Sequence, residues 1–202
     1  MIQELLREAT AFTWIDWLVT VTALIYVVLA ARGRVSAWIF GIVSCSFWAY
    51  ASYVFYQLYL DALLQIFYVV MGVIGIVSWQ RARRAASTTT LPVVRMTKDQ
   101  HMLFIGTGLA SSWLFGYLFA AYTTAAATYL DAFTTVFSML TTFLLLQRKL
   151  ENWLYWIVID VVYLYLYATR GAYLFSAVML VYLVVAAYGY LEWKRQWTPA
   201  DA

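Results

Sequence analysis

The sequence predicts an all-α polytopic membrane protein with seven transmembrane helices, arranged as two parallel three-helix repeats joined by a central helix (3+1+3). Of its 202 residues, 65% are hydrophobic and 11% are charged, whereas a soluble domain carries about 25% charged residues. Several apolar runs reach the length of about 20 residues that crosses a hydrocarbon core. They lack the alternating polarity of a membrane β-barrel. An internal repeat supplies the remaining observation.

The apolar runs define the expected spans in order along the chain. We expect them at residues 14–31, 36–57, 60–79, 101–122, 128–146, 152–169 and 172–193. Only Gln57 and Asp61 mark the break between the second and third spans. Residues 80–100 form the one long polar segment and are expected to be a connecting loop. Residues 1–202 are thus expected to form a single transmembrane domain without a cleavable signal peptide.

The cations are distributed unequally between the connections. All but two of the thirteen Lys and Arg residues follow the first, third, fifth and seventh spans, and the two exceptions are Arg7 and Arg170. Positive charge favours the cytoplasmic side. We therefore expect a multi-pass protein of the cell (inner) membrane, with its N-terminus outside and its C-terminus in the cytoplasm.

The chain aligns with itself over two long segments. Residues 14–38 align with 129–153, and residues 59–81 align with 173–195. The most telling pairs are Asp16/Asp131, Trp38/Trp153, Tyr68/Tyr182, Gly75/Gly189 and Trp79/Trp193. We interpret 14–79 and 128–193 as two three-helix repeats, with 101–122 as the linker helix. Parallel repeats of this kind occur in transporters, which hold substrate near mid-membrane at the repeat interface.

The linker span carries a stripe of small residues, namely Gly108, Ser112, Gly116 and Ala120. Such a stripe lets two helix backbones approach closely. We expect it to serve packing within the chain, and a subunit contact is the alternative.

The sixth span holds an acid, Asp160, near its middle. A charged side chain at mid-membrane costs roughly 2.5–3.5 kcal/mol on insertion scales and by default indicates function. Trp156 and Tyr163 share its helical face, and the first repeat has Cys45 in its place. An asymmetric ligand needs such a difference. The alternative is a hydrogen bond from Asp160 to a Tyr or Thr of the bundle.

The full set of candidate substrate-binding residues adds polar and aromatic side chains deep in other spans. Gln65 can both donate and accept hydrogen bonds, which suits a hydroxylated or amide-bearing ligand. Trp14, Trp17, Trp38, Trp193 and Trp197 are expected to pack against neighbouring helices or to form belts at the membrane interfaces. Asp61 lies near a span end and is expected only to be solvated. The candidate site comprises Trp48, Gln65, Tyr68, Trp156, Asp160, Tyr163 and Tyr182, and the structural motif comprises Gly75, Trp79, Trp153, Gly189 and Trp193.

Three segments carry a resemblance to a known family: "LYLDALLQIFYVVMGVIGIVSW", "NWLYWIVIDVVYLYLY" with its W-x-x-W, and "GAYLFSAVMLVYLVVAAYGYLEW". The chain resembles the Pnu family of vitamin transporters over nearly its whole length. The resemblance implies a homotrimer, facilitated diffusion of an unphosphorylated vitamin, and a cytoplasmic kinase that traps it. It places the ligand among Gln65, Tyr68, Trp156 and Asp160. One departure is that Ile76-Val77-Ser78 separates Gly75 from Trp79, where the family has Gly-Trp.

These features favour uptake of nicotinamide riboside by facilitated diffusion, without a cofactor, metal or nucleic acid. The alternatives are thiamine or riboflavin, and more distantly a sugar transporter or a proton-coupled carrier. A rhodopsin would need a lysine within its last span, and Lys194 lies at the end of that span. A membrane enzyme would need a nucleophile with a base or a metal cluster, yet His101 is the sole histidine and Cys45 the sole cysteine.

Overall fold

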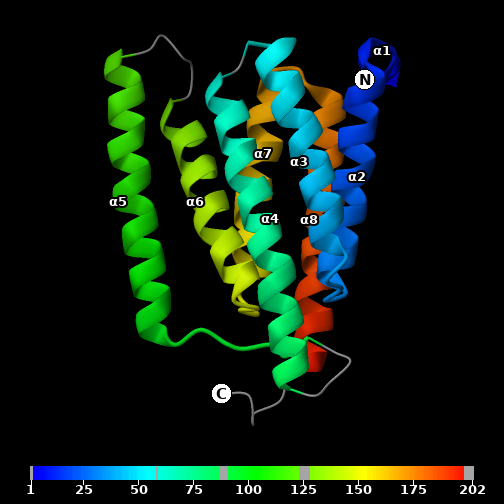
Figure 1. Cartoon of the computed structure of the whole chain (residues 1–202). Coiled ribbons are helices and arrows are strands. Elements are labelled where there is room, and N and C mark those ends of the chain that lie inside the picture. The colour runs from blue at the N-terminus through cyan, green and yellow to red at the C-terminus, as the bar shows by residue number, and fades with distance from the viewer. Residues whose placement is uncertain (1, 58, 87–90, 123–127, 198–202) are drawn as a thin grey trace.

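The computed structural model describes residues 2–57, 59–86, 91–122 and 128–197, and their backbone is mainly helical. From α2 onward the helices run alternately down and up, so that α2, α4, α6 and α8 share one direction (Figure 1). Their bounds are α1 Ile2–Ala11, α2 Trp14–Ala31, α3 Ala37–Val54, α4 Tyr59–Ala85, α5 Lys98–Tyr122, α6 Thr128–Leu146, α7 Asn152–Thr169 and α8 Tyr173–Gln196.

Within the described residues, six helices are long and apolar enough to cross a membrane, namely α2 to α6 and α8. This confirms an all-helical, multi-pass membrane protein. Helix α7 is outside that group although it has 18 residues, as α2 and α3 do. It carries Asn152 and Asp160 among its apolar residues, and it packs between α6 and α8.

The expected spans agree with the helices most closely at 14–31, 128–146 and 152–169, which are α2, α6 and α7. The loop expected over 80–100 is too long, because α4 continues to Ala85 and α5 already begins at Lys98. Gln, Arg and Ala, which make up most of the α4 extension, are strong helix formers outside the hydrocarbon as well as inside it. Residues 87–90 of that loop, and 123–127 between α5 and α6, lie outside the described residues.

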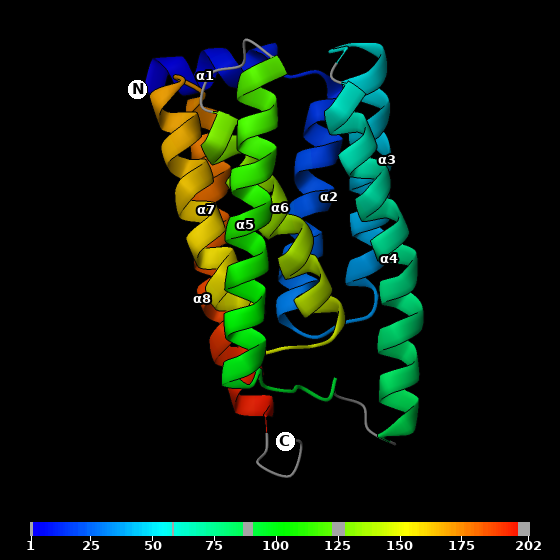
Figure 2. The same cartoon turned by 90° about the vertical axis from the view of Figure 1, so that its left-hand side faces the viewer.

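Helix α1 was not among the expected elements, because it is short and not apolar enough to span. It lies across the end of the bundle where α2 begins, roughly perpendicular to the other helices (Figure 2). The Glu8 carboxylate accepts hydrogen bonds from the backbone N–H groups of Tyr173 (3.2 Å) and Leu174 (2.7 Å). Ala172, the N-cap residue of α8, has no side chain that can do this. Glu8 therefore caps α8 from a distant part of the chain.

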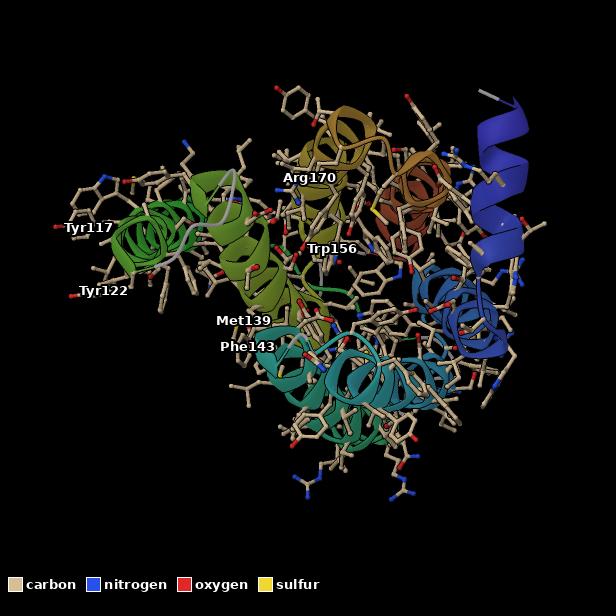
Figure 3. The ribbon with its side chains drawn as sticks, turned by 90° about the horizontal axis from the view of Figure 1, so that it is seen from above. Tyr117, Tyr122, Met139, Phe143, Trp156 and Arg170 are labelled. Atoms are coloured by element: carbon tan, nitrogen blue, oxygen red, sulfur yellow. The ribbon has the colours of Figure 1, made fainter. Side chains whose placement is uncertain are left out.

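Helix α5 packs mainly on α6 (Figure 3), and its His101 and Phe104 also contact Tyr155 of α7. Gly108 lies against the ring of Phe137, and Gly116 lies against the ring of Tyr129. The small-residue stripe thus serves packing within the chain, as expected. Its last member, Ala120, is exposed.

Four tryptophans form a buried cluster at the end of the bundle opposite α1. Trp79 contacts both Trp38 (5.2 Å between ring centroids) and Trp193 (5.9 Å), and Trp193 also contacts Trp153 (5.4 Å). Of the two roles expected for Trp38 and Trp193, packing is the one the structure supports, because they are 2% and 0% exposed. Trp14, by contrast, is 68% exposed.

The two glycines of the structural motif make room for two of these rings. A Cβ on Gly75 would overlap the indole of Trp38, and a Cβ on Gly189 would approach that of Trp153 to 2.7 Å. In each half of the chain, a tryptophan at the start of one helix thus lies on a glycine of the next helix. The sequence repeat predicts the pairs Trp38/Trp153 and Gly75/Gly189, and their contacts match.

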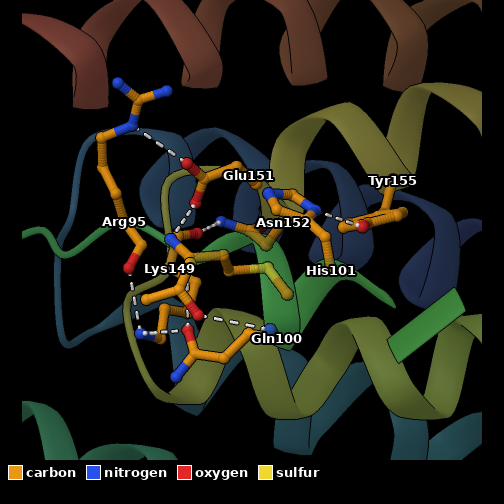
Figure 4. A network of polar contacts seen from close by, with 9 residues as sticks. Arg95, Gln100, His101, Lys149, Glu151, Asn152 and Tyr155 are labelled. Atoms are coloured by element: carbon orange, nitrogen blue, oxygen red, sulfur yellow. Dashed lines mark hydrogen bonds and ion pairs between the residues drawn. The ribbon is translucent and has the colours of Figure 1, made fainter. Parts of the chain in front are cut away.

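A polar network joins the start of α5 to the turn between α6 and α7 (Figure 4). The Glu151 carboxylate pairs with the Arg95 guanidinium (3.1 Å) and accepts from the backbone N–H of Met96 (2.9 Å). The Lys149 ammonium donates to the Arg95 carbonyl (3.1 Å) and to the side chain of Gln100 (3.2 Å). These contacts hold the start of α5 and the residues just before it close to the second half of the bundle.

Candidate functional site

A cavity of about 330 Å³ lies between the two halves of the bundle. Its walls come from α2, α3 and α4 on one side and from α6, α7 and α8 on the other, while α5 contributes no lining residue. Trp156 of α7 points toward this central region (Figure 3). All seven candidate residues line the cavity: Trp48, Gln65, Tyr68, Trp156, Asp160, Tyr163 and Tyr182. Trp153, on the same face of α7, instead lies in the tryptophan cluster.

Residues that align in the two halves of the sequence line this cavity together. At six aligned positions both members line it: Ala23/Ser138, Gly41/Trp156, Cys45/Asp160, Trp48/Tyr163, Gln65/Met179 and Tyr68/Tyr182. Only the last of these pairs is identical. The two walls are therefore related in position and different in chemistry, as an asymmetric ligand requires.

The sequence analysis missed several lining residues. Met179 was detectable, because it is the repeat equivalent of Gln65. Tyr26, Phe12 and Phe175 had no such signal, since aromatic residues fill most of these spans. The lining residues outside the candidate set include Phe12, Asp16, Tyr26, Ser138, Phe175 and Met179.

Asp160 is the one acid that lies deep in the bundle and on the cavity wall. The residue is only 3% exposed. Among the described residues, none donates a hydrogen bond to its carboxylate or forms an ion pair with it. The alternative that Asp160 bonds a bundle Tyr or Thr thus finds no support there. A buried carboxylate without a partner is costly, and a ligand in the cavity can supply that partner.

Aromatic rings line the cavity from α7 toward the α1 end. Tyr163 and Tyr167 are stacked, with centroids 5.8 Å apart and planes at 11°. Tyr167 contacts Phe175 (5.5 Å), which in turn contacts Phe12 (5.5 Å) just after α1. These rings offer flat surfaces to an aromatic ligand, and Phe12 lies where the cavity approaches α1.

A second acid, Asp16, lines the cavity near that end. Its carboxylate accepts from the Thr13 backbone N–H (2.8 Å) in a capping box that starts α2, and from the Tyr56 hydroxyl (2.9 Å). Partial burial, and then the bond to Asp16, raise the pKa of Tyr56 above its ordinary value. The repeat equivalent, Asp131, pairs instead with Arg170 (3.0 Å) and does not line the cavity.

Gln65 reaches the cavity from α4 and is held by a neighbour. Its Nε2 lies 3.4 Å from Oδ1 of Asp61, one turn earlier on the helix. Oδ2 of Asp61 accepts a hydrogen bond from the buried Ser52 hydroxyl (2.5 Å). The expectation that Asp61 is merely solvated was therefore wrong, because it links α3 to α4 beside the cavity.

Neither a metal site nor a catalytic arrangement appears in the part of the chain that the structure describes. No group of three or more His, Cys, Asp or Glu residues is placed to hold a metal ion there. The sole histidine, His101, bonds the Tyr155 hydroxyl (2.6 Å) on α7 and does not line the cavity. The arrangement suits binding of a flat, polar ligand.

A family model described as the nicotinamide mononucleotide transporter matches residues 13–195. The chain belongs to this family. Membership identifies a membrane transporter and not an enzyme, and it confirms the resemblance seen in the sequence.

The relatives of this family member carry a more specific name. A nicotinamide riboside transporter PnuC from Neisseria mucosa is 28% identical over 198 residues, covering 91% of this chain and 73% of that protein. PnuC from Escherichia coli is 23% identical, covering 90% and 85%. A crystal structure of the vitamin B3 transporter PnuC superimposes with a TM-score of 0.75 at 25% identity, covering 96% of this chain and 88% of that one.

Proposed function

We propose that this transporter carries nicotinamide riboside across the cell membrane by facilitated diffusion. The observation that supports this most directly is Asp160, a buried carboxylate on the wall of an aromatic cavity, without a partner among the described residues. The names of the relatives point to the same substrate. The cavity volume of about 330 Å³ lies within the range of roughly 300–1,000 Å³ that is usual for small-molecule sites.

The chemistry of the substrate fits these walls. Nicotinamide riboside has a pyridinium ring, which is flat and positively charged. A cation over an aromatic face gains about 0.5–2 kcal/mol, and Trp156, Tyr163 and Tyr182 offer such faces. The Asp160 carboxylate adds a charge pair, whose attraction strengthens away from water. In this assignment the rings hold the pyridinium plane and Asp160 balances its charge.

The same walls favour the riboside over the phosphorylated nucleotide. Two acids, Asp16 and Asp160, line the cavity, and none of the lining residues is Lys, Arg or His. A phosphate group adds about −1.5 to −2 charges at pH 7, which the carboxylates repel. A cytoplasmic kinase that phosphorylates the vitamin would therefore trap it inside the cell, and the cavity would not carry the product back.

The repeats give a route for alternating access. In our proposal, residues 14–79 and 128–193 are parallel three-helix units joined by 101–122, with seven spans in all. The matching contacts of Trp38 with Gly75 and of Trp153 with Gly189, together with the shared direction of α2 and α6 (Figure 1), support it. Rocking of one unit against the other would expose the central cavity to either side.

Orientation and assembly complete the proposal. All cations except Arg7 and Arg170 lie at the ends of α2, α4, α6 and α8 or in the segments that follow them, and these ends lie opposite α1 (Figure 2). By the positive-inside rule this end is cytoplasmic, and α1 lies outside. A homotrimer follows from the family resemblance alone. We propose passive transport, and the sequence lacks the Gly-rich GxxxxGK[ST] motif, so that this chain does not hydrolyse ATP by that route.

Binding of ligands to the purified protein tests the substrate. Nicotinamide riboside, nicotinamide mononucleotide, thiamine and riboflavin would be titrated side by side by calorimetry. We expect saturable binding of nicotinamide riboside. Binding of the mononucleotide should be at least tenfold weaker, a difference of about 1.4 kcal/mol, because Asp16 and Asp160 repel its phosphate. Tighter binding of thiamine, or equal binding of the mononucleotide, would contradict the proposal.

A further inference from the structure

The three side chains Ser52, Asp61 and Gln65 form a hydrogen-bonded chain that ends at the cavity. Ser52 is fully buried on α3, and its hydroxyl is 2.5 Å from Oδ2 of Asp61. Oδ1 of Asp61 faces Nε2 of Gln65 at 3.4 Å. Gln65 lines the cavity, whereas Ser52 and Asp61 do not. The acid thus stands behind the residue that can touch the substrate.

The chemistry of this chain selects one orientation of the Gln65 amide. A carboxylate accepts hydrogen bonds and donates none, while a side-chain amide has a donor end and an acceptor end. Asp61 can therefore bond only the NH₂ end of Gln65. Ser52, fixed by its burial, holds the other oxygen of Asp61 and keeps the carboxylate from turning. The carbonyl Oε1 of Gln65 is then the end left for a ligand.

We propose that Asp61 is a positioning residue that fixes Oε1 of Gln65 as a hydrogen-bond acceptor for an N–H or O–H group of the substrate. The inference rests on the proposed function, because it concerns the same cavity. In nicotinamide riboside, the donors are the carboxamide NH₂ and the ribose hydroxyls. Both have the chemistry that this acceptor recognises.

The second repeat lacks this device. The positions equivalent to Asp61 and Gln65 are Phe175 and Met179, and both line the cavity. The acceptor is thus present on the α4 wall and is replaced by apolar side chains on the α8 wall. With Asp160 on α7, the two polar contacts come from different halves, so that they fix which way round the substrate lies.

A double-mutant cycle separates positioning from a general structural role. Binding of nicotinamide riboside would be measured for the wild type, Asp61→Asn, Gln65→Ala and the double variant. In Asp61→Asn, the new side chain can bond either end of the amide, so that Gln65 is free to turn. We expect about tenfold weaker binding from Asp61→Asn in the wild-type background, and less than about twofold in the Gln65→Ala background.

Two further variants serve as a control and as a replacement for Asp61→Asn. Asp131→Asn removes another carboxylate at the same end of the bundle and should leave affinity unchanged, because Asp131 pairs with Arg170 away from the cavity lining. If Asp61→Asn does not fold, Ser52→Ala takes its place, and we expect about threefold weaker binding that again disappears without Gln65. An equal loss of affinity in both Gln65 backgrounds, or no loss in either, overturns the positioning role.

Two further ligands show which donor of the substrate is recognised, and they separate the role of Asp61 from the proposed function. Nicotinic acid riboside has a carboxylate in place of the carboxamide. If Oε1 accepts from the carboxamide, Asp61→Asn should no longer weaken binding of this analogue, and if it accepts from ribose the loss should persist. A wild type that binds thiamine and not nicotinamide riboside contradicts the proposed function, and the same cycle run with thiamine still decides the role of Asp61.

Discussion

At Asp160 the cost of burying a charge can be set against its pairing with a charged ligand. This residue lies in the middle of α7, 3% exposed, with a carboxylate that faces the cavity and has no partner among the described residues. An uncompensated buried charge is costly, and a well-placed opposite charge reduces the cost. A cationic substrate provides that charge only while it occupies the site, so that part of the binding energy comes from relieving the buried acid.

Asp160→Asn keeps the shape of this side chain and removes its charge. We expect affinity for nicotinamide riboside to fall roughly ten- to a hundredfold, because a hydrogen bond to a charged group is worth about 1.5–3 kcal/mol. Calorimetry on the purified variant measures this change. Riboflavin, whose ring is neutral, provides the comparison, and any affinity for it should be far less sensitive. Normal binding of nicotinamide riboside by a folded variant would show that Asp160 does not pair with the cation.

How well single residues could be predicted depended on how much they contrast with their surroundings. Asp160 and Gln65 contrast with apolar spans, and both line the cavity. For Trp38 and Trp193 the sequence left packing and an interfacial belt open, because a tryptophan near a span end looks the same in sequence whether it faces lipid or a glycine of the next helix. The role of Asp61 depends on Ser52 of another helix, which no local pattern reveals.

At the scale of elements, long apolar helices were predictable and their ends were not. Hydrocarbon thickness fixes the apolar length, but α4 and α8 continue past it in Arg- and Gln-containing turns. Helix α1 escaped prediction because its stability comes from contacts made elsewhere. Glu8 caps α8, and Phe12 just after α1 packs on Phe175.

Removing the remote cap should weaken the start of α8. We expect Glu8→Ala to destabilise the protein by about 0.5–2 kcal/mol, the usual effect of losing an N-cap, because the N–H groups of Tyr173 and Leu174 lose their acceptor. Thermal unfolding in detergent would show a lower midpoint. Arg7→Ala, on the exposed side of the same helix, is the matched control, and equal midpoints for the two variants would refute the cap.

The close contact between α3 and α4 makes a second prediction at this scale. Gly75→Ala places a methyl group inside the Trp38 ring, and overpacking of this kind costs typically 1–3 kcal/mol. Thermal unfolding again measures the effect. Gly106→Ala is the control, because a Cβ there meets no atom within 4 Å. A Gly75→Ala variant as stable as Gly106→Ala would contradict the packing described for the tryptophan cluster.

At the scale of the whole molecule, the repeat was visible in the sequence because tryptophan and glycine recur at matched positions. What differs between the repeats was harder to predict, since it depends on which side chains meet at the interface. The cavity is lined by aligned positions that hold unlike residues, such as Cys45 and Asp160. In the proposed alternating access, this combination would allow symmetric motion around an asymmetric site.

The distribution of cations predicts the orientation of the whole chain. An epitope tag after residue 202 should be cytoplasmic and a tag before residue 1 should be outside; both ends lie beyond the described residues. An impermeant reagent applied to intact cells should therefore label only the N-terminal tag, and permeabilised cells should show both. Labelling of the C-terminal tag in intact cells would exclude an odd number of spans with this orientation.

Uptake by liposomes that contain only the purified protein tests the central claim most directly. Labelled nicotinamide riboside should enter saturably without ATP or any ion gradient, reach the outside concentration and no more, and exchange with unlabelled vitamin loaded inside. Empty liposomes give the baseline, and liposomes with Asp160→Asn should take up less vitamin at low concentration. A strict requirement for a proton or sodium gradient, or accumulation above the outside concentration, would contradict facilitated diffusion and make Asp160 a coupling residue instead.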